Sequence, residues 1–320
     1  MRFVVHGAGA IGGVLGARLF QAGYDVVLIA RGSHYEAIRA DGLTIESADE
    51  RTTLRIPVVK QPRDITFAEA DVVLLAVKSQ NTASALDDLR EATPIALPVV
   101  CVQNGVANER MALRRFANVQ ATCVMCPAAH LEPGVVQAQS SPITGILDTG
   151  RYPHGIDTMT EEVVEAFRKA GFGAEARADI MRWKYTKLVM NLGNAVEGVC
   201  GKTEGADELT HRVRREGVEC LRAAGIEFAS AEEDRERRGS ILNIKPIGGA
   251  ARSGSSTWQS LQRATGSIET DYLTGEVVLI ARELGLAAPA NELLQRLANE
   301  AATLGRPPGS TPASEVLALL

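Results

Sequence analysis

Three glycines that follow the first apolar run of the chain constrain its fold more than any other feature. Residues 3–6 form a short, mostly apolar run typical of a buried strand, and residues 11–22 have helical spacing. Between them lies the pattern Gly7-x-Gly9-x-x-Gly12. Glycine is common, so the pattern alone is weak. A glycine turn that leaves a strand and opens a helix is, however, the context of the dinucleotide-binding fingerprint.

Each glycine has a separate physical role in such a turn. Gly7 permits the tight turn, Gly9 lets the backbone approach a pyrophosphate, and Gly12 allows close packing of the helix on the strand. The N–H groups of Ala10 and Ile11 lie at the positive end of the expected helix and would face the phosphates. We therefore predict that these five residues bind a dinucleotide. The alternative is a glycine-rich turn without a ligand.

The first half of the chain alternates apolar strand candidates with helical patterns. Near-continuous apolar strands separated by helices indicate a parallel sheet that is covered on both faces. Residues 43–59 alternate differently and predict a small antiparallel excursion. We expect an α/β fold with a Rossmann-type, doubly wound parallel sheet. Its further strands are expected over residues 25–30, 71–77, 98–102 and segments within 120–147, and its further helices over residues 82–92 and 107–116.

The second half of the chain has a different pattern. A length of 320 residues suggests two domains, because a single domain usually contains about 150 residues. A last strand over residues 171–177 ends the β/α pattern and divides the chain into domains 1–177 and 178–320. The charged residues 232–238 predict a solvated helix face or loop. We expect an all-helical C-terminal domain, with long helices over residues 183–199, 209–224, 256–284 and 290–304.

Charge and composition exclude several classes of partner. The chain has 34 Lys and Arg residues against 39 Asp and Glu residues, a net charge of -5. This balance argues against a protein that coats nucleic acid or an anionic membrane. No apolar run approaches the ~20 residues of a membrane-spanning helix, and the amino-terminus has no signal-peptide pattern. We expect a cytoplasmic protein with a small-molecule substrate and no nucleic-acid or membrane partner; a homodimer and a monomer both stay open.

The cysteines and histidines show no pattern of a disulfide or metal site. Five cysteines are an odd number, which does not suggest a disulfide framework in a long chain. Cys123-x-x-Cys126 lies in an apolar, strand-like run, and no second pair of this spacing accompanies it. We interpret both residues as core cysteines rather than as a redox or zinc site. The five histidines have no ligand spacing, so we predict no metal.

The end of the second expected strand indicates which dinucleotide is bound. In NAD-binding proteins, an acidic residue about 20 positions after the glycines accepts hydrogen bonds from the ribose hydroxyls. Asp25 comes too early, at the start of the strand, and Arg31 stands at its end. A guanidinium can bind a 2′-phosphate through two parallel hydrogen bonds. The sequence therefore favours NADP (NADPH) over NAD as the cofactor.

Further motifs extend the pattern along the chain. They are Ala76-Val-Lys78, Gln103-Asn104-Gly105, Trp183-x-x-x-Lys187-Leu188-x-x-Asn191, and Ser255-Ser256 followed by Glu269-x-Asp271-x-x-x-Gly275. With the glycine turn and Arg31, they make the sequence resemble the ketopantoate reductase (2-dehydropantoate 2-reductase) family over nearly the whole chain. The resemblance implies an N-terminal Rossmann domain, a helical C-terminal domain and a cleft between them. It also implies NADPH-dependent reduction of 2-dehydropantoate to pantoate, a step of pantothenate and coenzyme A biosynthesis.

The resemblance also implies a role for each site residue. Lys187 is implied to be the general acid that protonates the developing alkoxide. Glu269 is implied to be a second catalytically important residue, which helps to hold the substrate. The residues implied to line the cofactor site and reach toward the ketone are Lys78 and Asn104, and those implied to bind the substrate are Asn104, Asn191, Asn194 and Ser256.

The chemistry of a ketone reduction suits these residues. Hydride addition leaves negative charge on oxygen, so a nearby proton donor or cation lowers the barrier. Lys187, Asn191 and Asn194 follow one another at i, i+4 and i+7, which places all three on one face of a continuous helix. A cation with two amides in one stripe suits a hydroxylated carboxylate. Taken alone, such a stripe is more often plain solvated surface.

Three departures from the family pattern lie in the half of the site expected to shape the substrate pocket. The family has its second asparagine eight residues after the lysine, where this chain has Ala195 and places Asn194 one position earlier. Ser260 stands where the family commonly has an aspartate, and the stretch from Ser256 to Glu269 is one residue longer. The substrate is therefore left open. The alternatives are another branched or hydroxylated 2-ketoacid and a non-catalytic NADPH-binding regulator.

Overall fold

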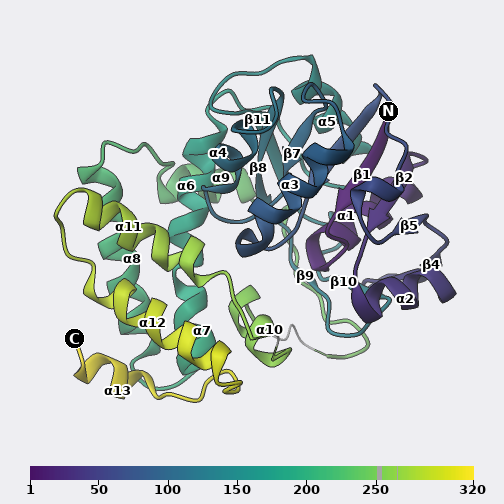
Figure 1. Cartoon of the computed structure of the whole chain (residues 1–320). Helices are drawn as coiled ribbons and strands as arrows, with labels where there is room; N and C mark the ends of the chain where they lie inside the picture. The colour runs from purple at the N-terminus through teal and green to yellow at the C-terminus, as the bar shows by residue number, and fades with distance from the viewer. Residues whose placement is uncertain (251–253, 265) are drawn as a thin grey trace. The chain divides into compact units, whose positions relative to one another are not determined.

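Two compact units make up the chain in the computed structural model, which describes residues 1–250, 254–264 and 266–320 (Figure 1). The first unit consists of Met1–Trp183 and Ala231–Arg252, and the second of Lys184–Ser230 and Ser253–Leu320. The chain therefore leaves the first unit, returns to it for one segment and leaves it again. As a division into a cofactor domain and a substrate domain, the limits 1–177 and 178–320 stay a prediction.

A seven-stranded, mainly parallel sheet forms the centre of the first unit. Its order is β11-β8-β7-β6-β1-β2-β5, and among the described strands of this sheet only β11 runs antiparallel, against β8. From β5 to β8 the order corresponds to 3-2-1-4-5-6, the arrangement of dinucleotide-binding folds, which confirms the predicted α/β class. The strands are β1 (Arg2–His6), β2 (Asp25–Ile29), β5 (Val58–Val59), β6 (Asp71–Leu75), β7 (Val99–Cys101), β8 (Val119–Met125) and β11 (Ile146–Arg151).

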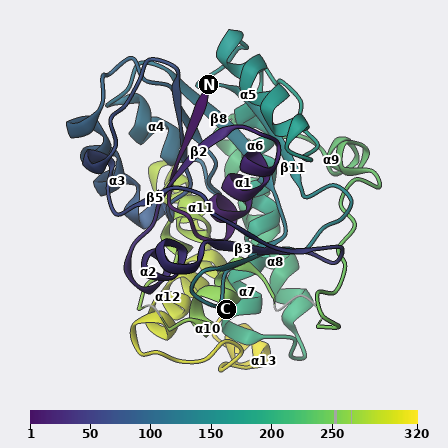
Figure 2. The ribbon, with the colours of Figure 1, turned by 90° about the vertical axis from the view of Figure 1, so that its right-hand side faces the viewer.

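Apolar side chains on both faces of this sheet explain why helices cover both faces. Successive side chains of a strand point to opposite faces. Phe3 and Val5 of β1 belong to one apolar core with Leu15, and Val4 belongs to another with Leu86. The first face is covered by α1 (Ala10–Gln21) and α5 (Thr158–Lys169), and the second by α3 (Thr82–Ala92) and α4 (Asn108–Leu113) (Figures 1 and 2). Three further helical elements of the first half of the chain are α2 (Gly32–Asp41), η1 (Pro62–Asp64) and η2 (Ser79–Asn81).

A second sheet of the first unit has four strands in the order β4-β3-β10-β9 and packs against α1. Strands β3 (Leu43–Glu46) and β4 (Arg51–Leu54) form the antiparallel pair predicted within residues 43–59. Strand β5, from the same predicted excursion, instead joins the large sheet in parallel with β2. Strands β9 (Ala128–Ala129) and β10 (Val135–Ala138) complete the small sheet.

The prediction of a strand over residues 171–177 is wrong. Gly173 and Ala176 each form only an isolated bridge to β11. Between them, the N–H group of Glu175 donates to Oδ1 of Asp148 at 3.0 Å. A side-chain carboxylate thus takes the place of a backbone carbonyl, and the regular hydrogen-bond ladder of a strand is interrupted.

The charged residues 232–238 belong to a helix, α9 (Ala231–Arg238), that lies beside β11 (Figures 1 and 2). Arg237 has only 8% of its side chain exposed and donates to Asp148 at 2.8 and 2.5 Å. The prediction of a solvated face is therefore wrong for this residue. A buried carboxylate is stable only with a partner, and a charge count cannot show which arginine supplies it.

The second unit is helical, as predicted. Its helices are α6 (Ile180–Asn191), which begins in the first unit, α7 (Gly193–Cys200), α8 (Ala206–Ala223), α10 (Ser256–Gln262), α11 (Thr274–Glu283), α12 (Pro289–Thr303) and α13 (Ala313–Ala318). Among the residues that the structure describes, no helix is long and apolar enough to span a bilayer.

Two of the predicted long helices are interrupted. The helix expected over residues 183–199 breaks at Leu192, which is fully buried against α8, where a Cβ on Gly217 would lie 2.6 Å from its Cδ1 atom. The helix expected over residues 256–284 is divided into α10, the short turn η3 (Thr270–Tyr272) and α11. Ala264 and Gly266 have φ angles of +50° and +78°, a backbone conformation that a right-handed helix cannot include.

Candidate functional site

Loops that carry predicted site residues meet at one edge of the large sheet. Strands β2, β1, β6 and β7 are parallel neighbours, so their carboxyl ends lie at the same edge. The strand order reverses between β1 and β6, and open α/β sheets bind ligands at such a reversal. The structure thus brings together the residues predicted to bind the cofactor, namely Gly7, Gly9, Ala10, Ile11, Gly12, Arg31, Lys78 and Asn104.

The glycine turn has the shape that a pyrophosphate requires. Gly7 has a φ angle of +107°, and a Cβ there would lie 2.8 Å from the backbone nitrogen of Val77. A Cβ on Gly12 would lie 2.1 Å from the carbonyl oxygen of Gly7, whereas a Cβ on Gly9 would meet nothing within 4 Å. Close packing therefore excludes side chains at Gly7 and Gly12. Beside Gly9 the structure leaves the space that an approaching phosphate group would need.

The amino-terminus of α1 adds positive potential to this turn. Gly9 is the N-cap residue, no side chain caps the helix, and its first turn contains no acidic residue. The N–H groups at the start of a helix favour an anion. The backbone donors of Ala10 and Ile11 therefore fit the phosphates of a dinucleotide.

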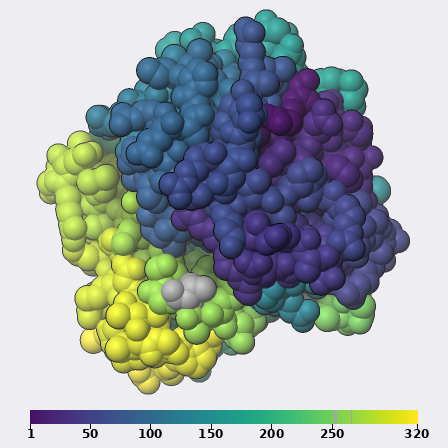
Figure 3. All heavy atoms as spheres, turned by 45° about the vertical axis from the view of Figure 1, so that its right-hand side comes forward, coloured from purple at the N-terminus to yellow at the C-terminus, as the bar shows by residue number. Residues whose placement is uncertain are grey.

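Arg31 lies two residues after the end of β2, as the N-cap residue of α2, with 65% of its side chain exposed. Its Nη2 atom lies 2.9 Å from Oδ2 of Asp88 on α3. An ion pair between exposed side chains is worth about 1 kcal/mol or less, so this pair leaves the Arg31 guanidinium able to bind a phosphate. Atoms of the amino-terminal segments, which include α2 and are purple and dark blue in Figure 3, lie at the surface of the first unit.

His34 of α2 connects the glycine turn with the small sheet. Its Nδ1 atom accepts a hydrogen bond from the N–H group of Gly134 at 2.9 Å, and its Nε2 atom lies 2.7 Å from the carbonyl oxygen of Ala8. Because Nδ1 accepts a hydrogen bond, Nε2 carries the proton and donates a hydrogen bond to the carbonyl oxygen of Ala8. Burial lowers the pKa of His34 and favours this neutral form. His34 therefore positions the glycine turn from inside the protein.

The burial of His6, the last residue of β1, leads us to expect a loss of stability in acid. Burial, assisted by the charge of Arg31, lowers the pKa of His6 from 6.5 to about 4. Between these values the unfolded chain binds a proton that the folded protein does not. His6 therefore does not lower the free energy of unfolding above pH 6.5. As the pH falls from 6.5 toward about 4, the free energy of unfolding decreases by about 1.4 kcal/mol for each pH unit.

We expect His6→Gln to remove this part of the pH dependence, because glutamine does not titrate. The measurement is urea unfolding at several pH values between 6.5 and about 4. His154→Gln, at an exposed position, is the matched control and should leave the slope unchanged. An equally steep loss of stability in His6→Gln and in the wild-type protein would show that another group causes it.

Buried side chains tie together the loops that carry Lys78 and Asn104. The Nε2 atom of Gln103 donates to the carbonyl oxygen of Val77 at 2.7 Å and to Oγ1 of Thr82 at 2.8 Å. Thr82 is fully buried and Gln103 is 4% exposed. Buried polar groups need their hydrogen bonds, so the loops after β6 and β7 are held in one arrangement.

Asn108, which is fully buried, continues this network. Its replacement is expected to lower both the stability of the protein and its affinity for the cofactor. Its Nδ2 atom donates to the carbonyl oxygen of Asn104 at 2.9 Å and to Oγ of Ser79 at 3.2 Å, and its Oδ1 atom accepts from Thr82 at 2.8 Å. We expect Asn108→Ala to lower the free energy of unfolding by about 2–3 kcal/mol and to raise the KM for NADPH. Asn81→Ala, exposed in the same region, is the control; equal effects of both variants would contradict the prediction.

In the second unit, Lys187 and Asn191 lie one turn apart on α6. Lys187 is half-buried and Asn191 is 5% exposed. Asn194 lies beyond the break at Leu192, on α7. The prediction of one continuous helix through all three residues is therefore wrong, because the helix is interrupted at Leu192, before Asn194.

Asn194 instead contacts another predicted site residue. Its Nδ2 atom donates to Oγ of Ser256 on α10 at 3.4 Å. Helices α7 and α10 come close together at Gly198, where a Cβ would lie 2.7 Å from Cγ2 of Thr257. Ala195, at the position of the family's asparagine, is 4% exposed in the core of the second unit. In this chain Asn194 is thus the asparagine that reaches Ser256.

Glu269 is 7% exposed and directly precedes η3. The residues that follow it in the motif have structural contacts. Asp271 accepts hydrogen bonds from Gln295 at 2.8 Å and from Asn299 at 2.7 Å, both on α12. A Cβ on Gly275 would lie 2.7 Å from Nε2 of Gln295. Asp271 and Gly275 therefore hold the segment of Glu269 against α12.

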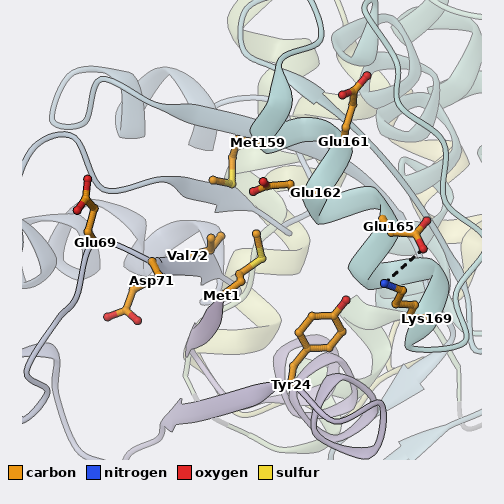
Figure 4. Close-up of a pocket in the computed structure, with 11 residues that line it drawn as sticks. Met1, Tyr24, Glu69, Asp71, Val72, Met159, Glu161, Glu162, Glu165 and Lys169 are labelled. Atoms are coloured by element: carbon orange, nitrogen blue, oxygen red, sulfur yellow. Dashed lines mark ion pairs between the residues drawn. The ribbon is translucent and has the colours of Figure 1, made fainter.

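A pocket of ≈ 710 Å³ lies at the other edge of the large sheet, away from the predicted site (Figure 4). Met1 and Asp71, at the amino ends of β1 and β6, line it together with Met159 and other residues of α5. Its lining contains five carboxylates, and Lys169 pairs with one of them, that of Glu165. Such a lining repels an anion, so we do not assign this pocket to the dinucleotide.

All five cysteines are free thiols. Cys123 is buried on β8, with its Sγ atom 3.5 Å from the carbonyl oxygen of Trp183, and Cys126 packs against the core of the first unit. These positions agree with the interpretation of both residues as core cysteines. Within residues 1–250, 254–264 and 266–320, no group of three or more His, Cys, Asp or Glu side chains could hold a metal ion.

The fold and the site together define an α/β protein of the dinucleotide-binding type with a helical C-terminal region. Comparisons with known proteins identify it more closely. Residues 3–150 match the family model for ketopantoate reductase PanE/ApbA, and residues 179–302 match the model for its C-terminal part. The 2-dehydropantoate 2-reductase of Pyrococcus horikoshii is 31% identical over 313 residues, which cover 95% of this chain and 99% of that protein. The chain belongs to the ketopantoate reductase (PanE/ApbA) family of oxidoreductases.

Other relatives and solved structures agree with this assignment. The 2-dehydropantoate 2-reductase of Archaeoglobus fulgidus is 30% identical over 92% of this chain and 96% of its own. The crystal structure of a PanE/ApbA family ketopantoate reductase from Ralstonia eutropha JMP134 has a TM-score of 0.79 at 27% identity, covering 96% of this chain and 100% of its own. D-mandelate dehydrogenase, solved with NADH and anilino(oxo)acetate, has a TM-score of 0.81 at 21% identity, covering 95% and 99%, and thus shares the fold.

Proposed function

We propose that the protein catalyses the NADPH-dependent reduction of 2-dehydropantoate (ketopantoate) to pantoate, in pantothenate and coenzyme A biosynthesis in the cytoplasm. One observation carries the proposal. The uncapped glycine turn and Arg31 follow the carboxyl ends of β1 and β2, which are neighbouring parallel strands, so both lie at the same edge of the sheet. The turn supports a dinucleotide, and an exposed guanidinium supports the form with a 2′-phosphate. The match to a 2-dehydropantoate 2-reductase along 95% of the chain supports the substrate.

The bound cofactor would supply a hydride to the ketone carbon. The chain must then stabilise the negative charge that develops on the ketone oxygen. We assign this task to Lys187, whose Nζ atom would donate a proton to that oxygen. Glu269 is assigned to hold the substrate. The remaining assignments are Lys78 and Asn104 to the cofactor side of the reacting ketone, and Asn191, Asn194 and Ser256 to the hydroxyl and carboxylate groups of the substrate.

A reductase of another 2-ketoacid is the second candidate. D-mandelate dehydrogenase has the same fold and a structure with anilino(oxo)acetate, a 2-ketoacid derivative. In this chain Asn194 takes the contact with Ser256, and position 260 is a serine. Both features lie among the residues assigned to the substrate. They favour a substrate whose side chain differs from that of 2-dehydropantoate.

The test is the oxidation of NADPH, followed by its ultraviolet absorbance, with a panel of 2-ketoacids. The panel contains 2-dehydropantoate, 2-oxoisovalerate, phenylglyoxylate and pyruvate, and each is repeated with NADH. Turnover confined to 2-dehydropantoate with NADPH supports the first candidate, and preferred turnover of another acid supports the second. Cofactor binding without any turnover would refute both and leave a non-catalytic NADPH-binding regulator.

A further inference from the structure

Ala8, between the first two glycines of the turn, is held by both of its backbone polar groups. Its N–H group donates to the carbonyl oxygen of Ile29 at 3.1 Å, and its carbonyl oxygen lies 2.7 Å from Nε2 of His34. Ala8 is only 2% exposed, so little water can reach either contact. The first contact is made by the backbone alone, whereas the second depends on one side chain.

The contact with His34 fixes the direction of the next N–H group along the chain. Both described cis peptide bonds precede proline, so the peptide group between Ala8 and Gly9 is trans. The C=O and N–H bonds of a trans peptide group lie in one plane and point in opposite directions. Since the carbonyl oxygen of Ala8 points toward the buried His34, the N–H group of Gly9 points away from it.

The N–H group of Gly9 is left available for a ligand. Among the hydrogen bonds of the described residues, none is donated by this group. A Cβ on Gly9 would meet nothing within 4 Å, so the backbone here borders open space. An available donor in the glycine turn suits a phosphate oxygen.

His34 is itself held in one orientation. It is 8% exposed, and its Nδ1 atom accepts from the N–H group of Gly134 at 2.9 Å, which makes Nε2 the donor. Its ring lies 4.0 Å from the ring of His130, centroid to centroid, at an angle of 46°. A Cβ on Gly134 would lie 3.0 Å from the Cβ of Ala37, so α2 packs closely against the loop between β9 and β10. The small sheet thus fixes the donor to Ala8.

We propose that His34 is a positioning residue of the cofactor site, which orients the Ala8–Gly9 peptide so that the N–H group of Gly9 faces the pyrophosphate. Gly9 then adds a third donor to those of Ala10 and Ile11. This role rests on the proposed function, because it requires a bound dinucleotide. The competing role is purely structural, as a polar contact that only holds α2 against the small sheet.

The experiment measures the Kd values of NADPH, NADH and adenosine 2′-monophosphate. The first two contain the pyrophosphate, and the third carries only the phosphate that is assigned to Arg31. His34→Leu keeps a bulky side chain and removes the donor to Ala8. We expect it to raise the Kd values of NADPH and NADH by the same factor, about 10- to 100-fold, because a hydrogen bond to a charged group is lost. The Kd of adenosine 2′-monophosphate should stay within about twofold.

Two further variants separate positioning from a loss of stability. His34→Gln keeps a donor and an acceptor on one side chain, so we expect it to bring the Kd of NADPH back to within about fivefold of the wild-type value. Ile38→Val is the matched control, since Ile38 is 2% exposed on the same helix. It should lower the urea midpoint of unfolding and leave all three Kd values unchanged.

A measurement on the wild-type protein tests the same contact if His34→Leu does not fold. Nitrogen-15 NMR of the imidazole rings shows which nitrogen of each ring carries the proton. The signal of His34 is the one that is missing from His34→Gln. We expect the proton on Nε2 in the free protein, and a shift of this signal when NADPH or NADH is added.

The outcomes separate this role from the proposed function. Unchanged Kd values in His34→Leu, or a proton on Nδ1 of His34 in the wild-type protein, would overturn the positioning role. An equal loss for all three ligands would assign His34 to the structural role and overturn it as well. Those results leave the proposed function intact, because the wild-type protein still binds the cofactor. A wild-type protein that binds neither NADPH nor NADH refutes both together.

Discussion

Replacing Lys187 by alanine is expected to lower kcat with NADPH and the preferred 2-ketoacid by about 100- to 10,000-fold, the usual contribution of a general acid. The physical reason is that the ketone oxygen gains negative charge as the hydride arrives, and Lys187 supplies the proton that removes it. The KM for NADPH should change little, because the cofactor is assigned to the first unit. The measurement is steady-state NADPH oxidation at saturating substrate.

Two further variants make this prediction specific. Lys202→Ala removes an exposed lysine of the same unit and should leave kcat unchanged. Lys187→Arg keeps a positive charge but donates a proton far less readily, so we expect it to retain binding of the 2-ketoacid and to lose most of the turnover. Full activity of Lys187→Ala in a folded protein would show that another group protonates the oxygen.

Replacing Arg31 by alanine is expected to raise the KM for NADPH by about 10- to 100-fold, because a bidentate, charge-assisted contact to the 2′-phosphate is lost. The KM for NADH should change by less than about twofold, since NADH lacks this phosphate. The selectivity between the two cofactors therefore falls, while kcat at saturating NADPH stays near the wild-type value. The measurement is the ratio of kcat/KM for the two cofactors.

Arg39, which lies exposed on the same helix, provides the matched control. Arg39→Ala should leave the ratio unchanged. Asp88→Ala removes the ion-pair partner of Arg31. We expect it to change the ratio of kcat/KM for the two cofactors by less than about fivefold, because exposed pairs contribute about 1 kcal/mol or less. An unchanged KM for NADPH in Arg31→Ala would remove the support for NADPH as the preferred cofactor.

The predictions made around the glycine turn, which depended on neighbouring residues, agree with the structure. The strand before Gly7, the helix after it and the position of Arg31 at the end of β2 all follow from patterns within about ten residues. The α/β class followed from the same local patterns repeated along the first half of the chain. Local backbone preferences and alternating apolar side chains decide such features, so they are visible in the sequence.

The predictions that depended on long helices were wrong in part. Periodicity over residues 183–199 indicated one helix, because it cannot show that Leu192 packs into the space left by Gly217. The structure divides this segment at Leu192 into α6 and α7, so Lys187 and Asn194 lie on different helices. The positive φ angles at Ala264 and Gly266 ended α10 in a segment whose apolar spacing continued.

The contacts that hold the site in place were absent from the prediction. Thr82 and Asn108 have no motif that marks them, and only the folded chain brings them together with Gln103 between the loops after β6 and β7. Arg237 and Asp148 lie 89 positions apart and form a buried pair. No spacing rule connects residues at such separations.

The sequence by itself determined the class of fold, the glycine turn and the arginine just after β2. These depend on residue type and local spacing, whereas the lysine and the glutamate that are assigned to the chemistry come from the resemblance to the family. Only the tertiary structure decided that Asn194 contacts Ser256 and that His34 supports the glycine turn. These contacts join residues on different elements, and the packing of those elements determines their distances.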